Sequence, residues 1–248
     1  MTRLDLALAA RSLAPSRSRA AVLIREGRVT VDGTLCRRPS EQVADTDTVE
    51  VSGTDADFVG RGGLKLEAAI AAFSPELAGL VCLDVGASTG GFTDCLLRKG
   101  AQSVFAVDVG HDQLDERLRT DERVTVIEGF NFRYAEPAQF VPAPQFAVVD
   151  VSFISLSLIL PPLRAVLAQE GRAIVLVKPQ FEAGAKALNK NGIVRNEADR
   201  QAAIERVRGF AGQSGFRVQG LIESPVKGGN GHGDGNMEYL MYLGEPSE

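Results

Sequence analysis

The stretch VCLDVGASTGGFTDCLL (81–97) runs from an apolar segment through a glycine-rich turn into a second apolar segment. Its first five residues predict a buried strand, and its last residues predict a helix. Gly86, Gly90 and Gly91 lie in the turn, where the missing side chains permit a tight bend and a close approach of the backbone to a ligand. A strand, a turn and a helix in this order are the repeating unit of an α/β domain.

Similar apolar stretches follow along the chain, with helical segments between them. The further strand candidates are residues 103–109, 124–128, 146–151 and 173–178. Continuous apolar strands that alternate with helices are typical of a parallel sheet covered on both faces. Residues 216–226 and 237–244 indicate two more strands joined by a glycine-rich loop, which we expect to form an antiparallel hairpin at one side of the sheet. The predicted fold class is a doubly wound, Rossmann-like α/β domain.

Residues 1–60 predict a separate small α+β domain. Apolar residues at helical spacing indicate a helix in 3–13, and a second helix is expected between a cap at Ser16 and Gly27. The pair Asp32-Gly33 is a strong signal for a two-residue hairpin turn, and DTVEVSG supplies a further strand. The polar segment SGTDAD (52–57) is expected to be a linker, so we place the boundary near residue 60 and assign 61–248 to the α/β domain.

Composition and cysteine content bound the class of protein. The 248 residues are 44% hydrophobic and 24% charged, which is typical of a globular protein. The apolar runs are shorter than the roughly 20 residues needed to cross a bilayer, and the N-terminus lacks a secretory signal. We therefore expect a cytoplasmic protein without a membrane span. Cys36, Cys82 and Cys95 are odd in number and predict reduced thiols, and with only two histidines beside them we expect no metal site.

Charge is distributed unevenly along the chain. The net charge is −5, yet residues 1–40 hold eight arginines against three acidic residues, whereas residues 41–57 hold six acidic residues and no basic one. A basic segment on an acidic protein indicates a nucleic-acid contact, and a merely solvated surface is the alternative. The expected RNA-binding arginines, which would hold phosphates without reading the base sequence, are Arg3, Arg11, Arg17, Arg19, Arg25, Arg37 and Arg38.

Ligands of open α/β sheets bind outside the carboxyl ends of the strands. Asp108 ends the second strand, 24 residues after Asp84, where an acidic residue can accept hydrogen bonds from both hydroxyls of a ribose. The turn matches neither a Walker loop nor G-x-G-x-x-G, and no lysine or arginine opens the following helix, so a nucleoside without phosphates fits better than a nucleotide. S-adenosylmethionine is the commonest such cofactor, and a purely structural turn is the alternative. The candidate cofactor-binding residues are Asp84, Gly86, Ala87, Ser88, Gly90, Gly91, Asp108, Asn131 and Asp150.

Two lysines and an aspartate add a possible reaction to this site. Asp150 ends the fourth strand, Lys178 ends the fifth, and Lys65 lies just before the first helix of the domain. Methyl transfer to a hydroxyl needs an aligned nucleophile that loses its proton. A lysine can act as the base, or when protonated it can stabilise the developing oxyanion. For each lysine alone, a solvated surface charge is the alternative.

Five motifs of the α/β domain, together with RLDLALAARSLAPSRSRAAVLIREGRVTVDG (3–33), resemble one family from about residue 3 to residue 243. GRGGLKL, CLDVGASTGGFTDCLL, DVSFISL, LVKPQFE and NMEYLMYL together resemble the TlyA family of ribosomal RNA 2′-O-methyltransferases, sometimes described as hemolysins. In this family an S-four-type RNA-binding domain precedes an FtsJ-like methyltransferase fold. The resemblance implies S-adenosylmethionine as the methyl donor and the ribose 2′-hydroxyl of a cytidine in ribosomal RNA as the acceptor. It also implies a catalytic set of Lys65, Asp150, Lys178 and Glu238. From the residues alone, Glu238 could equally be a solvated charge on an edge strand.

Several finer expectations follow. Asn131 could bond the adenine edge or be an ordinary turn asparagine, and Phe153 could stack on an extruded base or be a buried aromatic residue. The sequence starts almost directly in the first helix and stops at LGEPSE without the extra C-terminal helix of longer relatives. The resemblance then implies methylation of the large-subunit RNA, as naked RNA or within an assembled subunit. We expect a monomer.

Three other functions stay open at this point. A membrane-active hemolysin would need an apolar or basic amphipathic helix, which the sequence does not indicate. An RNA-binding ribosome assembly factor without catalysis fits the first domain but leaves Lys65, Asp150 and Lys178 unexplained. A nicotinamide-dependent dehydrogenase is disfavoured by the sequence of the turn.

Overall fold

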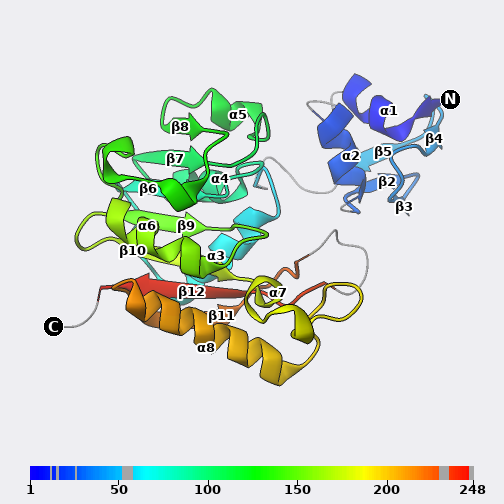
Figure 1. Ribbon diagram of the computed structural model, residues 1–248. Helices are drawn as coiled ribbons and strands as arrows, with labels where there is room; N and C mark the ends of the chain where they lie inside the picture. Colours follow the sequence, from blue (N-terminus) through cyan, green and yellow to red (C-terminus); the bar gives the residue numbers. More distant parts are fainter. Residues whose placement is uncertain (12, 15–16, 26, 52–57, 229–234, 246–248) are drawn as a thin grey trace. The chain divides into compact units, whose positions relative to one another are not determined.

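The computed structural model describes residues 1–11, 13–14, 17–25, 27–51, 58–228 and 235–245. The chain divides between Asp57 and Phe58 into two compact units, close to the boundary expected near residue 60 (Figure 1). The expected helix cap at Ser16, the expected linker 52–57 and most of the glycine-rich loop lie outside the described residues.

The first unit contains two short helices and two small antiparallel sheets. Its helices are α1 (Leu4–Ala10) and α2 (Arg17–Arg25), and its strands are β1 (Thr2–Arg3), β2 (Val29–Val31), β3 (Thr34–Cys36), β4 (Gln42–Val43) and β5 (Val49–Val51). The strand order of the larger sheet is β3-β2-β5, and β1 pairs with β4. Asp32 and Gly33 both have positive φ, 48° and 74°, which the two-residue turn between β2 and β3 requires, so the predicted hairpin is confirmed.

The second unit is built on one seven-stranded sheet. Its strands are β6 (Val81–Val85), β7 (Ser103–Val107), β8 (Val124–Ile127), β9 (Phe146–Val149), β10 (Arg172–Val177), β11 (Arg217–Glu223) and β12 (Tyr239–Gly244). Their order is β11-β12-β10-β9-β6-β7-β8. The five strands from β10 to β8 are parallel, whereas β12 runs antiparallel to both β10 and β11, as expected for the C-terminal hairpin.

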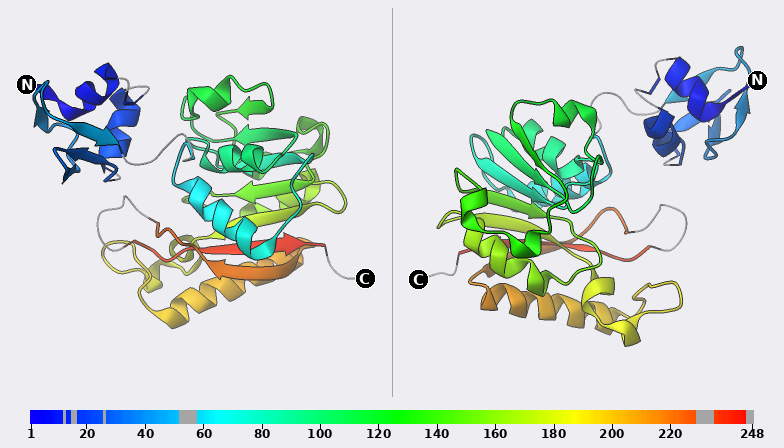
Figure 2. Two further views of the ribbon diagram at one scale, coloured as in Figure 1. Left: turned by 180° about the vertical axis from the view of Figure 1, so that it is seen from behind. Right: turned by 45° about the horizontal axis from the view of Figure 1, so that its top comes forward.

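Helices cover both faces of this sheet (Figures 1 and 2). The α-helices of the unit are α3 (Gly62–Phe73), α4 (Gly91–Arg98), α5 (Glu116–Arg119), α6 (Leu160–Val166), α7 (Pro179–Glu182) and α8 (Glu197–Gln213). Short 3-10 turns lie at Phe132–Tyr134, Pro137–Gln139, Leu156–Leu158 and Ala185–Ala187. Alternate strand residues point to opposite faces, so Cys82, Val148 and Ile174 pack with α3 and α4, whereas Leu83 and Val175 pack with α6 and α8. The predicted doubly wound α/β fold is therefore confirmed.

The strand order reverses between β6 and β9. The chain proceeds from β6 to β7 and β8 on one side, and then returns to β9 and β10 on the other. Helices on the two sides diverge at this point, which leaves room for a ligand at the carboxyl ends of the strands. Among the described residues, no helix is long and apolar enough to span a bilayer.

Candidate functional site

The glycine-rich turn after β6 is packed tightly against three neighbouring segments. Gly86 has φ +87°, and a Cβ there would overlap the backbone carbonyl of Asp150. Gly90 has φ +95°, and a Cβ would overlap the side chain of Leu118. Gly91 lies against the backbone of residues 60–63, at the start of α3. Packing alone therefore requires these glycines, whether or not a ligand also approaches the turn.

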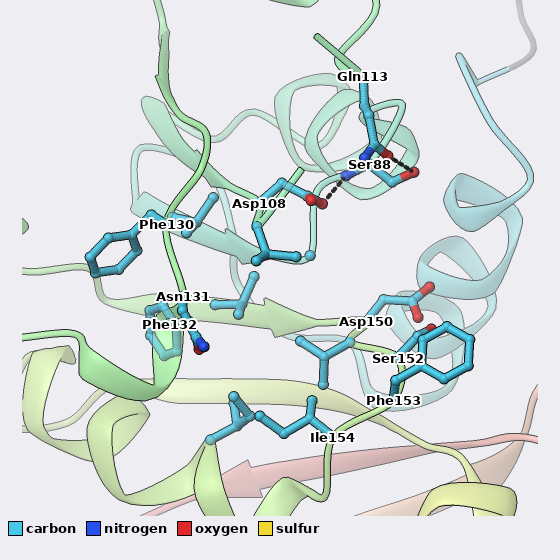
Figure 3. A pocket seen from close by; sticks show the side chains of 16 residues that line it. Ser88, Asp108, Gln113, Phe130, Asn131, Phe132, Asp150, Ser152, Phe153 and Ile154 are labelled. Atoms are coloured by element: carbon cyan, nitrogen blue, oxygen red, sulfur yellow. Dashed lines mark hydrogen bonds between the residues drawn. The ribbon is translucent and has the colours of Figure 1, made fainter. Parts of the chain in front are cut away.

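A cavity of about 510 Å³, which we call the smaller cavity, opens beside this turn (Figure 3). It lies at the carboxyl ends of β6, β7 and β9. Its lining residues are Val85, Gly86, Ser88, Val107, Asp108, Val109, Gln113, Phe130, Asn131, Phe132, Asp150, Val151, Ser152, Phe153, Ile154 and Ile159. Mostly apolar walls with a few polar groups are typical of small-molecule sites.

Asp108 is the most strongly oriented polar group of the smaller cavity. Its Oδ2 accepts a hydrogen bond from the backbone N–H of Ser88 at 2.8 Å (Figure 3). Its Oδ1 accepts one from the N–H of Gly110 at 2.7 Å. Each oxygen keeps capacity for a further bond, which two vicinal hydroxyls of a ribose could supply. The hydroxyl of Ser88 donates to Gln113 Oε1 at 3.4 Å. Asn131 accepts from the N–H of Arg133 through Oδ1, so it caps a turn and also lines the cavity.

The charge of the smaller cavity fits a nucleoside that carries no phosphate. None of the described residues that line it is Lys, Arg or His, whereas Asp108 and Asp150 are acidic. Asp150 is paired with Lys178 at 2.6 Å, but no lining residue of this cavity supplies a cation beside Asp108. A phosphate next to Asp108 would therefore be repelled, whereas a positively charged group would be attracted. Val109, which is 71% exposed, offers an apolar surface beside Asp108. S-adenosylmethionine, an unphosphorylated nucleoside with a sulfonium centre, fits this combination.

Some of the predicted cofactor residues do not line the smaller cavity. Ala87, Gly90 and Gly91 belong to the packed turn itself, and Asp84 is completely buried beneath it. Thr93 Oγ1 donates to Asp84 Oδ2 at 2.7 Å, while Asp84 Oδ1 has no hydrogen-bond partner among the described residues. Burial raises the pKa of the Asp84 carboxyl to about 7.

A second cavity of about 1070 Å³, which we call the larger cavity, adjoins the first. Its lining residues are Arg61, Lys65, Gly86, Ser88, Asp150, Ser152, Phe153, Lys178, Gln180, Phe181, Leu188, Asn191, Gly192, Ile193, Lys227, Gly228, Gly235, Asn236 and Glu238. Both cavities are lined by Gly86, Ser88, Asp150, Ser152 and Phe153, which we call the junction. The two cavities therefore adjoin at the junction.

The four residues of the expected catalytic set form a continuous charged chain along the larger cavity. Lys65 Nζ lies 2.7 Å from Glu238 Oε2 and 3.6 Å from Asp150 Oδ2. Lys178 Nζ lies 2.6 Å from Asp150 Oδ1 and donates to Ser152 Oγ at 2.8 Å. Negative and positive side chains therefore alternate along the series Glu238, Lys65, Asp150 and Lys178. Lys65 and Glu238 are in contact although they lie 173 positions apart in the sequence.

The topology explains why these residues meet. Asp150 and Lys178 follow the neighbouring parallel strands β9 and β10, so both lie at the same edge of the sheet. Glu238 precedes β12, and the antiparallel register that pairs Tyr239 with Val177 brings it to that edge as well. Gly228 allows the close approach, because a Cβ there would overlap the Glu238 carboxylate.

The exposure of these charged side chains decides between a functional residue and a solvated surface charge, the two alternatives that the sequence left open. Lys65 is 9% exposed, Lys178 is 8% and Glu238 is 3%, so none of them is a solvated surface charge. Burying charges is costly unless they are paired, and here each has an opposite charge within 4 Å. Phe153 is 92% exposed rather than buried, has φ +63°, and its ring packs at 5.2 Å from that of Phe181.

The expected RNA-binding arginines of the first unit have different surroundings. Arg3 and Arg17 each lie 3.0 Å from the buried carboxylate of Asp5, and the hydrogen bond from Arg3 is the largest cause that lowers the pKa of Asp5 to about 2. Arg11 donates to the backbone carbonyls of residues 44 and 47, which gives it a structural role in the unit. Arg25, Arg37 and Arg38 are exposed, and the Nε of Arg38 lies 3.4 Å from the carboxylate of Glu41. The side chain of Arg19 lies outside the described part of the chain.

Reasoning from the sequence missed Ser152, Gln113 and Glu182. Ser152 bonds Lys178, and Gln113 lines the smaller cavity. Glu182 is buried and bonds the loop after β9. Ser152 lies in the motif DVSFISL with Asp150, and Glu182 lies in the motif LVKPQFE with Lys178. Closeness in sequence to these two candidate residues was the signal that could have indicated them. Among the described residues, no group of three or more His, Cys, Asp or Glu side chains could hold a metal ion.

Comparison with known families assigns both units. Residues 58–244 match the FtsJ-like methyltransferase family, and residues 2–49 match the S4 domain. The protein named "Putative rRNA methyltransferase YqxC" from Bacillus subtilis (strain 168) is 44% identical over 99% of this chain and 86% of its own length. The 16S/23S rRNA (cytidine-2′-O)-methyltransferase TlyA of Mycobacterium tuberculosis (strain CDC 1551 / Oshkosh) is 40% identical over 97% of this chain and 89% of its own.

A solved structure extends the similarity to three dimensions. The structure named "Putative hemolysin from Streptococcus thermophilus" has a TM-score of 0.78 and 43% sequence identity, over 98% of this chain and 88% of that one. Names of two kinds, methyltransferase and hemolysin, thus accompany similar sequences.

Proposed function

Because this chain belongs to the TlyA family, whose members join an S4 domain to an FtsJ-like methyltransferase domain, we propose that it methylates ribosomal RNA. The proposed reaction transfers a methyl group from S-adenosylmethionine to the ribose 2′-hydroxyl of a cytidine. The observation that carries the proposal is the chain of ion pairs from Glu238 through Lys65 and Asp150 to Lys178, which includes the junction residue Asp150.

The smaller cavity is the proposed donor site. When bound, S-adenosylmethionine supplies an electrophilic methyl group on a positively charged sulfur. Asp108 would accept hydrogen bonds from the ribose hydroxyls, and Asn131 would bond the adenine edge. Asp108 would attract the positive charge, and the apolar walls would exclude water around the adenosine.

The larger cavity is the proposed acceptor site, with Lys178 next to the 2′-hydroxyl. Asp150 and Ser152 hold the Lys178 ammonium from two directions, which fixes the position of Nζ at the junction. As an ammonium, Lys178 would stabilise the developing oxyanion while the O–CH₃ bond forms and the S–CH₃ bond breaks. Only after losing its own proton could its amine take the hydroxyl proton instead. Lys65, itself held by Glu238, would keep the Asp150 carboxylate in place. Phe153, exposed at the junction, would stack on the base of the target nucleotide.

The first unit would hold the RNA outside the target site. Arg25, Arg37 and Arg38 are exposed and would contact phosphates, with Arg3 and Arg17 oriented by Asp5. Such a substrate would be met in the cytoplasm. One chain supplies the lining of both cavities, so we expect a monomer to be active.

A non-catalytic assembly factor is the strongest competing function. It would use the S4 domain but would have no need for three buried charged side chains, Lys65, Lys178 and Glu238, paired at a cavity. A membrane-active hemolysin has only the names of relatives in its favour.

The test is transfer of labelled methyl groups from S-adenosylmethionine to separated ribosomal subunits, and to naked ribosomal RNA, from a host that lacks the enzyme. The proposal predicts label on a single cytidine, with S-adenosylhomocysteine as an inhibitor. Label on the large or the small subunit identifies the substrate. RNA binding without label on any of these substrates would favour the assembly factor.

A further inference from the structure

The loop that follows β9 forms an arch over the junction. It begins at Asp150, whose N–H is fixed by the carbonyl of Val85 at 2.9 Å, and it ends at Leu156, the first residue of a 3-10 turn. Between these ends it carries Ser152, which bonds Lys178, and Phe153, which is almost fully exposed at positive φ. Positive φ is strained for an aromatic residue, so neighbouring contacts must hold this conformation.

Glu182 fixes the far end of the arch. It is the last residue of α7 and is 5% exposed. Its Oε1 accepts the backbone N–H of Leu156 at 2.8 Å, and its Oε2 accepts the hydroxyl of Ser155 at 2.7 Å. Ser155 Oγ lies 2.9 Å from Ser157 Oγ as well. Both oxygens of one buried carboxylate are therefore used to hold the same loop.

The same carboxylate links the arch to the segment that carries Lys178. Pro179 begins α7 directly after Lys178, and the backbone carbonyl of Glu182 accepts a hydrogen bond from the guanidinium of Arg206 on α8. A second and a third contact join the two segments, namely Lys178 to Ser152 and Phe153 to Phe181. These two contacts hold residues 152 and 153 but not residues 155 and 156. Of the contacts described here, only those of Glu182 hold residues 155 and 156.

We propose that Glu182 is a positioning residue for the acceptor nucleotide, an inference that rests on the proposed function. By holding residues 155 and 156 it would keep Ser152 on Lys178 and keep Phe153 exposed where the target base enters. The groups proposed to hydrogen-bond the donor, Asp108 and Asn131, lie on other loops, whereas residues 150–154 of the arch contribute only to the lining that the two cavities share or adjoin. Loss of the Glu182 carboxylate should therefore weaken the use of RNA far more than the binding of S-adenosylmethionine.

The test compares Glu182→Ala and Glu182→Gln with wild type. Glutamine can still accept the Leu156 N–H and can donate to the Ser155 hydroxyl, so it should restore the anchor. For Glu182→Ala we expect kcat/KM for RNA to fall about 10- to 100-fold, because misplacement by about 1 Å is enough for such a loss. The Kd for S-adenosylmethionine should stay within about twofold. Glu170→Ala, which removes an exposed carboxylate from the same unit, is the matched control.

Amide hydrogen exchange supplies a readout that needs no activity. A peptide covering residues 150–158 should exchange faster in Glu182→Ala than in Glu182→Gln or Glu170→Ala. If Glu182→Ala does not fold, Ser155→Ala removes one of the two anchoring bonds and should give a smaller effect of the same kind. Unchanged exchange and unchanged RNA kinetics would overturn the proposal. So would equal losses of RNA use and donor affinity, or failure of glutamine to restore function.

The two proposals can fail separately. If wild type transfers no methyl group to RNA, the proposed function fails, whereas the exchange comparison still decides whether Glu182 anchors the arch. If wild type is active and Glu182→Ala matches it, only the role of Glu182 is lost.

Discussion

The two cavities are built in different ways from the same sheet. The smaller cavity gathers residues that follow strand ends close to one another, and its key carboxylate, Asp108, is oriented by two backbone N–H groups. The larger cavity takes its charged groups from α3 and from the positions just after β9 and β10 and just before β12, and side-chain ion pairs hold them. A site oriented by backbone suits recognition of a fixed cofactor, whereas paired lysines and carboxylates suit proton chemistry. The difference means that donor binding and turnover can be disrupted separately.

The largest expected effect separates chemistry from donor binding. Lys178→Ala removes the only group of the charged chain that faces both Asp150 and Ser152, so methyl transfer should fall by at least about 100-fold, the size of a general acid–base contribution. The Kd for S-adenosylmethionine should change little. Single-turnover kinetics and calorimetry measure the two quantities. Lys99→Ala is the matched control, because Lys99 pairs with Glu67 on the surface. Turnover equal to wild type would refute the role of Lys178.

The reverse separation comes from the smaller cavity. Asp108→Asn loses the charge that would accept ribose hydroxyls, and hydrogen bonds to charged groups contribute about 1.5–3 kcal/mol. We expect the Kd for S-adenosylmethionine to rise about 10- to 100-fold, with kcat at saturating donor changed much less. Calorimetric titration checks this. Asp112→Asn, on the exposed loop after Asp108, should bind as wild type does. Equal affinities for both variants would contradict the assignment of the donor site.

A smaller effect concerns the ion pair between Lys65 and Glu238 in the lining of the larger cavity. Glu238→Gln leaves buried Lys65 with only the more distant Asp150, and removal of one partner of a buried pair destabilises proteins by about 3–5 kcal/mol. Retained Asp150 should bring the loss to the lower end of this range or below it. Urea denaturation measures it. The double variant Lys65→Met with Glu238→Leu should be more stable than Glu238→Gln but inactive. If Glu238→Gln were as stable as wild type, the Lys65–Glu238 ion pair would be exposed to solvent and not buried.

The smallest effect lies beneath the smaller cavity, at Asp84. Its folded pKa near 7 is above the reference value of 3.8, so between these pH values the folded state binds a proton that the unfolded state has lost. This contribution favours folding at low pH and is lost as the pH rises towards 7. The asparagine side chain of Asp84→Asn does not titrate, so this variant lacks that pH-dependent contribution to stability. Its stability relative to wild type should therefore increase by about 1 kcal/mol or more between about pH 5 and pH 8. A pH-independent difference would contradict the raised pKa.

Local signals made most of the fold predictable. The apolar stretch 81–85 and the pair Asp32-Gly33 act within a few residues, and both predictions are confirmed. Strand ends were less accurate, since 103–109 was expected and the strand ends at Val107. The pairing of β1 with β4 was missed, because each is only two residues long and carries no periodic signal.

The charged site was predictable only in part. Asp150 and Lys178 could be proposed from their places at strand ends, but the contact between Lys65 and Glu238 joins residues 173 positions apart and was implied only by resemblance. No periodicity encodes such a contact, since it depends on the register of β12. Glu182 was missed because glutamate is rarely buried, and nothing in the sequence indicates that two donors of a distant loop bond it.

The most direct test of the whole account is the identity of the methylated nucleoside. Ribosomal RNA methylated by this protein would be digested to nucleosides, and the labelled product identified by liquid chromatography and mass spectrometry. We expect 2′-O-methylcytidine, with the added mass on the ribose fragment. A methyl group on the cytosine base, or no methylated nucleoside with any ribosomal substrate, would contradict it.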